Sequence, residues 1–113
     1  MGRRVEICID ATEPDGVRAF WRTALAYVDE LKDDGAVDLV DPEGEGPTVW
    51  FQRVPEARTA EKNRLHLDIF VTDPEREELA ARLVTLGGKI LAIHPGFTVL
   101  ADPEGNELCL TLG

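Results

Sequence analysis

The chain contains no serine, only two cysteines and no long apolar run. The absence of serine excludes serine-nucleophile chemistry, and the sequence also lacks a P-loop, a C-x-x-C pair and an H-E-x-x-H motif. No apolar stretch reaches the roughly 18 residues that a membrane helix needs, and the first residues lack the apolar core of a signal peptide. We therefore expect a cytoplasmic protein of one domain.

Basic residues are scarce as well, since 12 Lys and Arg stand against 22 Asp and Glu, for a formal net charge of −10. This balance argues against nucleic acid and anionic membranes as partners. It would favour a cationic ligand or a metal ion, although acid scattered for solubility gives the same total. Cys8 and Cys109 both lie in apolar, strand-like runs, so we expect buried free thiols.

The most informative stretch is 62–74, K-N-R-L-H-L-D-I-F-V-T-D-P. Its apolar residues alternate with polar ones, which predicts a strand with one buried face formed by Leu65, Leu67, Ile69 and Val71. The other face carries His66 and Asp68, two residues apart and therefore pointing the same way. Asp73 is expected to cap a following helix, with Pro74 at its first position.

The hydrophobic periodicity predicts two helices, over 14–26 and 74–86. It predicts strands over 4–10, 27–31, 36–40, 48–54, 64–72, 89–94, 97–101 and 107–112. In the first helix Trp21 belongs to the apolar stripe and is expected in the core. His94 precedes Pro95 and Gly96 and is expected to be a solvated turn residue.

The chain also repeats itself. V-E-I-C-I-D at 5–10 matches L-H-L-D-I-F at 65–70, and D-P-E-G occurs at 41–44 and again at 102–105. The two aspartates that open these tetrapeptides, Asp41 and Asp102, are expected to form turns. We therefore predict an α+β fold in which one domain contains two tandem βαβββ modules, 1–54 and 63–113, joined by a linker over 55–62.

A four-stranded sheet with one helix has one uncovered face. Two such sheets side by side would form a curved mixed sheet, or half-barrel, around a cleft of the kind that binds small molecules. The side chains predicted to line this cleft are those of Glu6, Cys8, Asp10, Trp50, Gln52, His66, Asp68, Phe70, Glu107 and Cys109. Trp50 could instead belong to the core.

Several of these motifs carry a family resemblance: A-F-W in the first helix, F-Q-R-V-P at 51–55, K-N-R-L-H-L-D at 62–68 and D-P-E-G-N-E-L-C-L at 102–110. They resemble the vicinal oxygen chelate superfamily, which includes glyoxalases, extradiol dioxygenases and bleomycin-resistance proteins. The closest likeness is to its small glyoxalase-like domain proteins. The resemblance implies a paired-module fold, a small-molecule ligand and a homodimer.

The resemblance also implies where a metal would bind, because metal-using members take one ligand from the first and last strand of each module. By register these positions fall on Glu6, on Gln52 (or Trp50), on His66 and on Cys109, where the family usually has a glutamate. The candidate metal ligands are therefore Glu6, Gln52 and His66. A divalent metal ion is left open as a cofactor, and no other cofactor is expected; a mixed set that includes Cys109 would suit zinc.

His66 and Asp68 are the candidate catalytic residues. Asp68 could orient the imidazole, replace a missing metal ligand or act as a general base, a role that Glu107 could also fill. A purely structural alternative is a half-buried His66 that is hydrogen-bonded to Glu6 or Asp68.

These observations favour a glyoxalase/bleomycin-resistance-like protein that binds a small molecule in the cleft without the full metal ligand set. The alternative is a divalent-metal-dependent lyase, isomerase or dioxygenase, in which the ion polarises a substrate oxygen. A non-catalytic regulatory partner is a third hypothesis.

Overall fold

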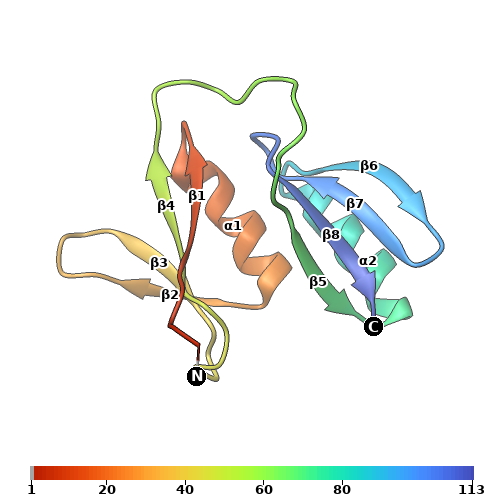
Figure 1. Cartoon of the computed structure of the whole chain (residues 1–113), viewed down its shortest axis with the longest axis horizontal. Coiled ribbons are helices and arrows are strands. Elements are labelled where there is room, and N and C mark those ends of the chain that lie inside the picture. Colours follow the sequence, from red (N-terminus) through yellow and green to blue (C-terminus); the bar gives the residue numbers. More distant parts are fainter. Residues whose placement is uncertain (1) are drawn as a thin grey trace. The chain divides into compact units, whose positions relative to one another are not determined.

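A computed structural model describes residues 2–113 and shows two compact units, one ending at Glu56 and the other formed by Ala57–Gly113 (Figure 1). The first unit contains β1 (Ile7–Ala11), α1 (Pro14–Leu25), β2 (Val28–Leu31), β3 (Val37–Val40) and β4 (Val49–Arg53). The second contains β5 (Leu67–Val71), α2 (Asp73–Thr85), β6 (Lys89–His94), β7 (Phe97–Ala101) and β8 (Glu107–Leu112). The predicted α+β class with two βαβββ modules is confirmed.

Each module builds its own four-stranded mixed sheet, in the order β1-β4-β3-β2 or β5-β8-β7-β6. In both sheets the first strand pairs in parallel with the last, and the other pairs are antiparallel. This topology places residues about 40 positions apart in the sequence on neighbouring strands, as with Asp68 and Cys109.

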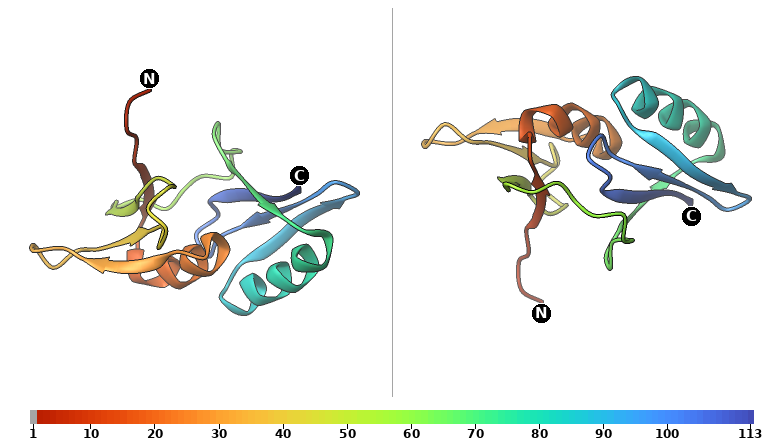
Figure 2. Two further views of the ribbon diagram at one scale, coloured as in Figure 1. Left: turned by 90° about the horizontal axis from the view of Figure 1, so that it is seen from below. Right: turned by 90° about the horizontal axis from the view of Figure 1, so that it is seen from above.

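One face of each sheet is covered by its helix (Figure 2). The predicted stripe of α1 is confirmed, because Val17, Phe20, Trp21 and Ala24 are buried. On α2 the buried side chains are Ala80 and Leu83, and Leu100, Leu108 and Leu110 are the fully buried residues of its sheet. Among residues 2–113 no helix of the same module covers the other face of either sheet, which we call the open face.

The start of α2 corrects one prediction. Thr72, and not Asp73, is the N-cap: its hydroxyl accepts the Glu75 N–H, while the Glu75 carboxylate accepts the Thr72 N–H at 3.0 Å. This capping box satisfies two backbone donors. Asp73 is the first helical residue, where its charge faces the positive end of the helix dipole.

Two strands begin later than the alternation predicted. The first paired residues are Ile7 of β1 and Leu67 of β5. Val5 and Leu65 precede them and are exposed, at 65% and 88%, so the assignment of Leu65 to the buried face was wrong. Alternation identifies the two faces of a strand, whereas the length of the neighbouring strand decides where pairing begins.

The prediction that both thiols are buried was half right. Cys109 is 7% exposed, but Cys8 is an exposed free thiol. Cys8 alternates with the buried Ile9 and Ala11 and therefore lies on the open face of its sheet.

The two D-P-E-G turns are confirmed. Asp41 accepts the backbone N–H groups of Glu43 and Gly46, at 2.9 and 2.8 Å. Asp102 is only 2% exposed and accepts those of Glu104 and Asn106, at 2.8 and 2.9 Å. Across residues 2–113 we find no helix with the length and apolar character needed to span a membrane.

Candidate functional site

The open face of the second module carries two rows of side chains set by strand register. Asp68 on β5 pairs with Cys109 on β8, which pairs with Val99 on β7. The next row runs from Phe70 through Thr111 to Phe97 in the same strand order. Parallel and antiparallel pairing thus bring three strands together to form one continuous surface.

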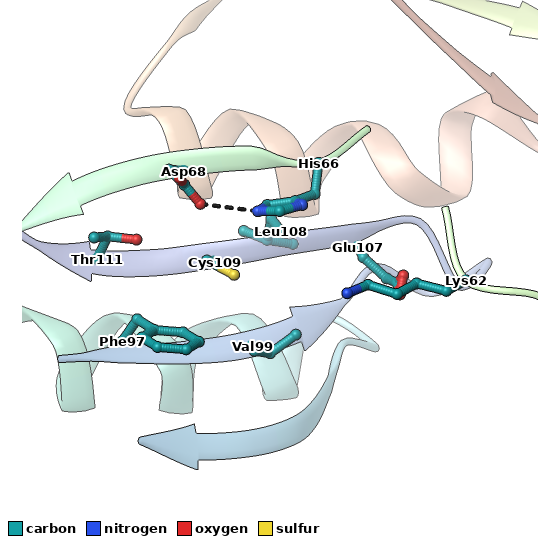
Figure 3. Close-up of a pocket in the computed structure, with 9 residues that line it drawn as sticks. All are labelled: Lys62, His66, Asp68, Phe97, Val99, Glu107, Leu108, Cys109 and Thr111. Atoms are coloured by element: carbon teal, nitrogen blue, oxygen red, sulfur yellow. Dashed lines mark ion pairs between the residues drawn. The ribbon is translucent and has the colours of Figure 1, made fainter. Parts of the chain in front are cut away.

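This surface is hollowed, with an open cavity of about 380 Å³ (Figure 3). The residues that line the cavity are Lys62, His66, Asp68, Phe97, Val99, Glu107, Leu108, Cys109 and Thr111. His66 and Asp68, from β5 and the residue before it, lie on one side of Cys109. Phe97 and Val99 of β7 lie on the other side (Figure 3). Mixed apolar and polar hollows of this size bind small molecules.

His66 and Asp68 interact directly, with 3.1 Å between His66 Nε2 and Asp68 Oδ1. Both side chains are about half exposed. A carboxylate at this distance can orient an imidazole and raise its basicity as a ligand. Of the two partners predicted for His66, Glu6 and Asp68, the structure shows a contact with Asp68.

Cys109 lies in the floor of the hollow beside this pair. Burial, and next the charge of Asp68, raises the pKa of the Cys109 thiol, while Lys62 acts in the opposite direction. In the absence of a bound partner the group is therefore a neutral thiol at neutral pH. One donor atom from each of His66, Asp68 and Cys109 lies within 4.8 Å of the other two.

The segment before β5 closes one end of the hollow. The backbone N–H of Asn63 donates to Glu107 Oε2 at 3.2 Å, and Arg58 donates to Asn63 Oδ1 at 2.9 Å. The Asn63 bond attaches residues 58–63 to the start of β8, and Lys62 and Glu107 both line the hollow (Figure 3). One cation and one carboxylate therefore lie at this end.

Sequence reasoning missed five lining residues, namely Lys62, Phe97, Val99, Leu108 and Thr111. A signal existed for some of them. Phe97 and Val99 alternate along β7 with the buried Thr98 and Leu100, so an antiparallel pairing with β8 would have placed both on the open face. The position of Lys62 had no such signal, because it depends on the course of a loop.

Several of the predicted residues of the first module lie close to one another. Cys8 Sγ lies 3.8 Å from both Asp10 Oδ1 and Gln52 Oε1, and Cys8 pairs with Trp50 in the strand register. Glu6 precedes β1 and forms an ion pair with Arg4. That these residues line one cleft with those of the second module stays a prediction, as do the catalytic roles of His66 and Asp68.

The second module's donors do not fit a hard cation such as Mn²⁺ or Mg²⁺. Such ions prefer oxygen ligands, with imidazole as the tolerated nitrogen donor. Here a buried thiol, Cys109, occupies the position at which the resemblance implies a glutamate. Thiolate is a soft ligand that favours zinc and copper over manganese and magnesium.

Comparison with solved structures gives the same fold. A fosfomycin resistance protein from Listeria monocytogenes superposes with a TM-score of 0.78 at 13% identity, covering 100% of this chain and 94% of that one. A hypothetical protein from S. aureus gives 0.74 at 16% identity, covering 100% and 95%. A glyoxalase/bleomycin resistance protein from Albidiferax ferrireducens T118 gives 0.70 at 16% identity, covering 96% of each chain.

The comparison with curated protein sequences finds no match. The sequence profile of the family described as "Glyoxalase-like domain" matches residues 6–111, which is nearly the whole chain. The two βαβββ modules and the parallel pairing of first and last strands agree with this match. The chain therefore belongs to the glyoxalase-like domain family of the vicinal oxygen chelate superfamily.

Proposed function

We propose that this protein binds a small molecule on the open face of its second module, and that it does so without the hard-metal ligand set of metal-using relatives. The observation that carries the proposal is the hollow in which the contacting pair His66 and Asp68 faces Phe97 and Val99 across Cys109. We propose His66 and Asp68 as its central polar contacts.

The lining defines the chemistry of the ligand. Phe97 and Val99 offer an apolar wall that suits a flat or aromatic group. Asp68 and Glu107 supply two carboxylates against the single ammonium of Lys62. A compact ligand with an aromatic or aliphatic body and a cationic or hydrogen-donating group fits both features, and the net charge of −10 would favour its approach.

A metal-dependent activity is the second candidate. A variant of the Listeria fosfomycin resistance protein is known in complex with Mn(II) and a dihydroxypropylphosphonic acid. The same fold therefore holds a metal ion in that protein. We rank this candidate second because a buried thiol occupies the fourth ligand position in this chain. Stoichiometric Mn²⁺ in protein purified from manganese-supplemented cells would reverse the ranking.

The test is a thermal-shift panel of small cationic and aromatic compounds on the full chain. A ligand present at 100 times its Kd adds about 2.7 kcal/mol to the free energy of unfolding, which raises Tm by about 10 °C in a domain of this size. For any compound that raises Tm, titration calorimetry then compares wild type with Asp68→Asn and His66→Gln.

The matched control is Glu78→Gln, which removes one acidic charge from an exposed position on α2. We expect about tenfold weaker binding for Asp68→Asn and unchanged binding for the control. The proposal would be contradicted if no compound raises Tm. It would also be contradicted if the ligand binds Asp68→Asn and His66→Gln with the same affinity as wild type.

We also propose that the protein is a homodimer. β6 is the terminal strand of its sheet, and its Ile90, Leu91 and Ile93 are exposed. An exposed apolar edge strand is a surface that proteins usually cover. Light scattering during gel filtration should give twice the 12.5 kDa chain mass, and a strictly monomeric profile would remove this proposal.

A further inference from the structure

We infer that the second module by itself binds a zinc ion through His66, Asp68 and Cys109. The three side chains offer a nitrogen, an oxygen and a sulfur donor, the combination of ligand types that zinc accepts. All three come from one compact unit, on β8 and on β5 with the residue preceding it. The site would need no residue of the first module.

The geometry supports binding to one ion. Donor atoms of the three residues lie within 4.8 Å of one another. With bond lengths of about 2.0–2.3 Å, the ligands of a tetrahedral zinc lie about 3.3–3.8 Å apart. The exposed side chains of His66 and Asp68 can close this difference by rotation, while Cys109 is held by its strand. Figure 3 shows the sulfur lying between the histidine–aspartate pair and the apolar wall.

The charges also favour a divalent cation. Asp68 and a Cys109 thiolate would together neutralise its two charges. Glu107 adds a carboxylate to the same hollow and Lys62 adds an ammonium, so these two neighbours offset each other. His66 would bind through Nε2 after that nitrogen exchanges its present partner, Asp68, for the metal.

Binding would be coupled to loss of a proton. The Zn–S bond forms as the Cys109 thiol releases its proton to the buffer, while His66 binds as neutral imidazole and Asp68 as carboxylate. Three protein ligands leave the fourth tetrahedral position to water or to a bound compound. The site would therefore be an open one, facing the cavity.

The experiment is a titration of the reduced, metal-free full chain with Co²⁺, a spectroscopic substitute for zinc. Thiolate coordination produces sulfur-to-cobalt charge-transfer absorption in the near ultraviolet, which oxygen and nitrogen donors do not produce. We expect saturation at one ion per chain and loss of the band when Zn²⁺ is added. Native mass spectrometry of the zinc-loaded protein counts the ions independently.

Variants assign the donors. Cys109→Ser should abolish the charge-transfer band, whereas Cys8→Ser, which removes the other thiol, should leave it unchanged. His66→Gln and Asp68→Asn should each weaken Zn²⁺ binding at least about tenfold, because loss of a residue that merely supports a ligand already costs about 10- to 100-fold. These two positions are exposed, so both variants should fold even if Cys109→Ser does not.

The inference is overturned if folded wild type gives no charge-transfer band, if the band follows Cys8, or if His66→Gln and Asp68→Asn both bind zinc as wild type does. It does not depend on the proposed small-molecule ligand. Repeating the thermal-shift panel on metal-free and zinc-loaded protein separates the two: a protein that binds zinc but no compound fails the proposed function alone, and one that binds compounds but no zinc fails this inference alone.

Discussion

The two modules have the same topology but carry different chemistry at matching places. In the first, the thiol is on the first strand, where Cys8 pairs with Trp50 on the last. In the second the thiol is on the last strand, where Cys109 pairs with Asp68. The residue that precedes the first strand by one position is Glu6 in one case and His66 in the other. The βαβββ backbone provides the positions, and the side chains decide what each can bind.

The modules also differ in how firmly their sheets are built. β8 pairs with β7 at five positions, whereas β4 pairs with β3 only at Leu39 and Val49. β8 also carries three consecutive buried residues, Leu108, Cys109 and Leu110. The hollow thus lies on the more continuous of the two sheets, which suits a site that must hold its side chains in place.

The two thiols give the sharpest contrast. Because Cys8 is exposed and Cys109 is buried, a thiol reagent should react in a fast phase and a slow phase of one thiol each. Partial desolvation of the sulfur and a neighbouring carboxylate, Asp10 for Cys8 and Asp68 for Cys109, raise the pKa of both thiols, so both phases should quicken as the pH rises. The variant Cys8→Ser should lack the fast phase and keep the slow one. Equal rates for the two thiols would remove the contrast.

Cores of unequal depth predict unequal losses. Leu110 and Phe51 occupy matching positions, paired with Ile69 and Ile9. Leu110 is fully buried and Phe51 is half-buried. Leu110→Ala should therefore lower the free energy of unfolding by about 3 kcal/mol and Phe51→Ala by about 1 kcal/mol, as measured by urea denaturation. A larger loss for Phe51→Ala would contradict this ordering.

The D-P-E-G turns should differ in the same direction. Asp102→Ala would leave the part-buried backbone donors of Glu104 and Asn106 without the buried carboxylate that accepts from them, at a cost of about 2 kcal/mol. Asp41→Ala removes the equivalent bonds at a more exposed turn, where water can replace the carboxylate, and should cost less. Comparing the two midpoints of urea unfolding tests this. Equal midpoints would show that burial of the turn is irrelevant.

The helix starts provide a smaller contrast. Thr72→Ala removes the capping box of α2 and should lower the free energy of unfolding by about 1 kcal/mol. At α1 the N-cap Glu13 makes no capping hydrogen bond through its side chain, so Glu13→Ala should leave stability nearly unchanged. Thermal unfolding of both variants makes the comparison. A Glu13→Ala protein that loses as much as Thr72→Ala would contradict it.

The weakest effect expected is a pH dependence. The Glu43 and Gly46 amides that donate to Asp41 hold the pKa of this carboxyl below its usual value. A lowered folded pKa contributes stability above the unfolded pKa of about 3.9, and that contribution is lost as the pH falls through the folded pKa. Asp41→Asn should therefore show a shallower acid loss of stability. Unfolding midpoints measured at several pH values below about pH 5 give the slope of stability against pH. An unchanged slope would mean that other carboxyl groups cause the loss of stability in acid.

Local sequence patterns predicted most of the fold. The apolar stripe with Trp21 and the D-P-E-G turns each depend on interactions within a few residues, and each was found as expected. The starts of β1 and β5 and the exposure of Cys8 were not predicted correctly. They depend on which strand lies alongside and on which face of the sheet the helix covers. His66, Asp68, Glu107 and Cys109 were identified as candidates, while Phe97 and Val99 were not.

The sequence by itself determined the two modules, their helices and the two faces of each strand, since these follow from periodicity, capping residues and turn residues. Only the tertiary structure decided that His66 and Asp68 on one side, Cys109 in the middle and Phe97 and Val99 on the other side share one hollow. The physical reason is that strand register is a long-range property. Hydrogen bonds between β5, β8 and β7 bring together residues up to 43 positions apart, as from His66 to Cys109, and no local preference encodes that alignment.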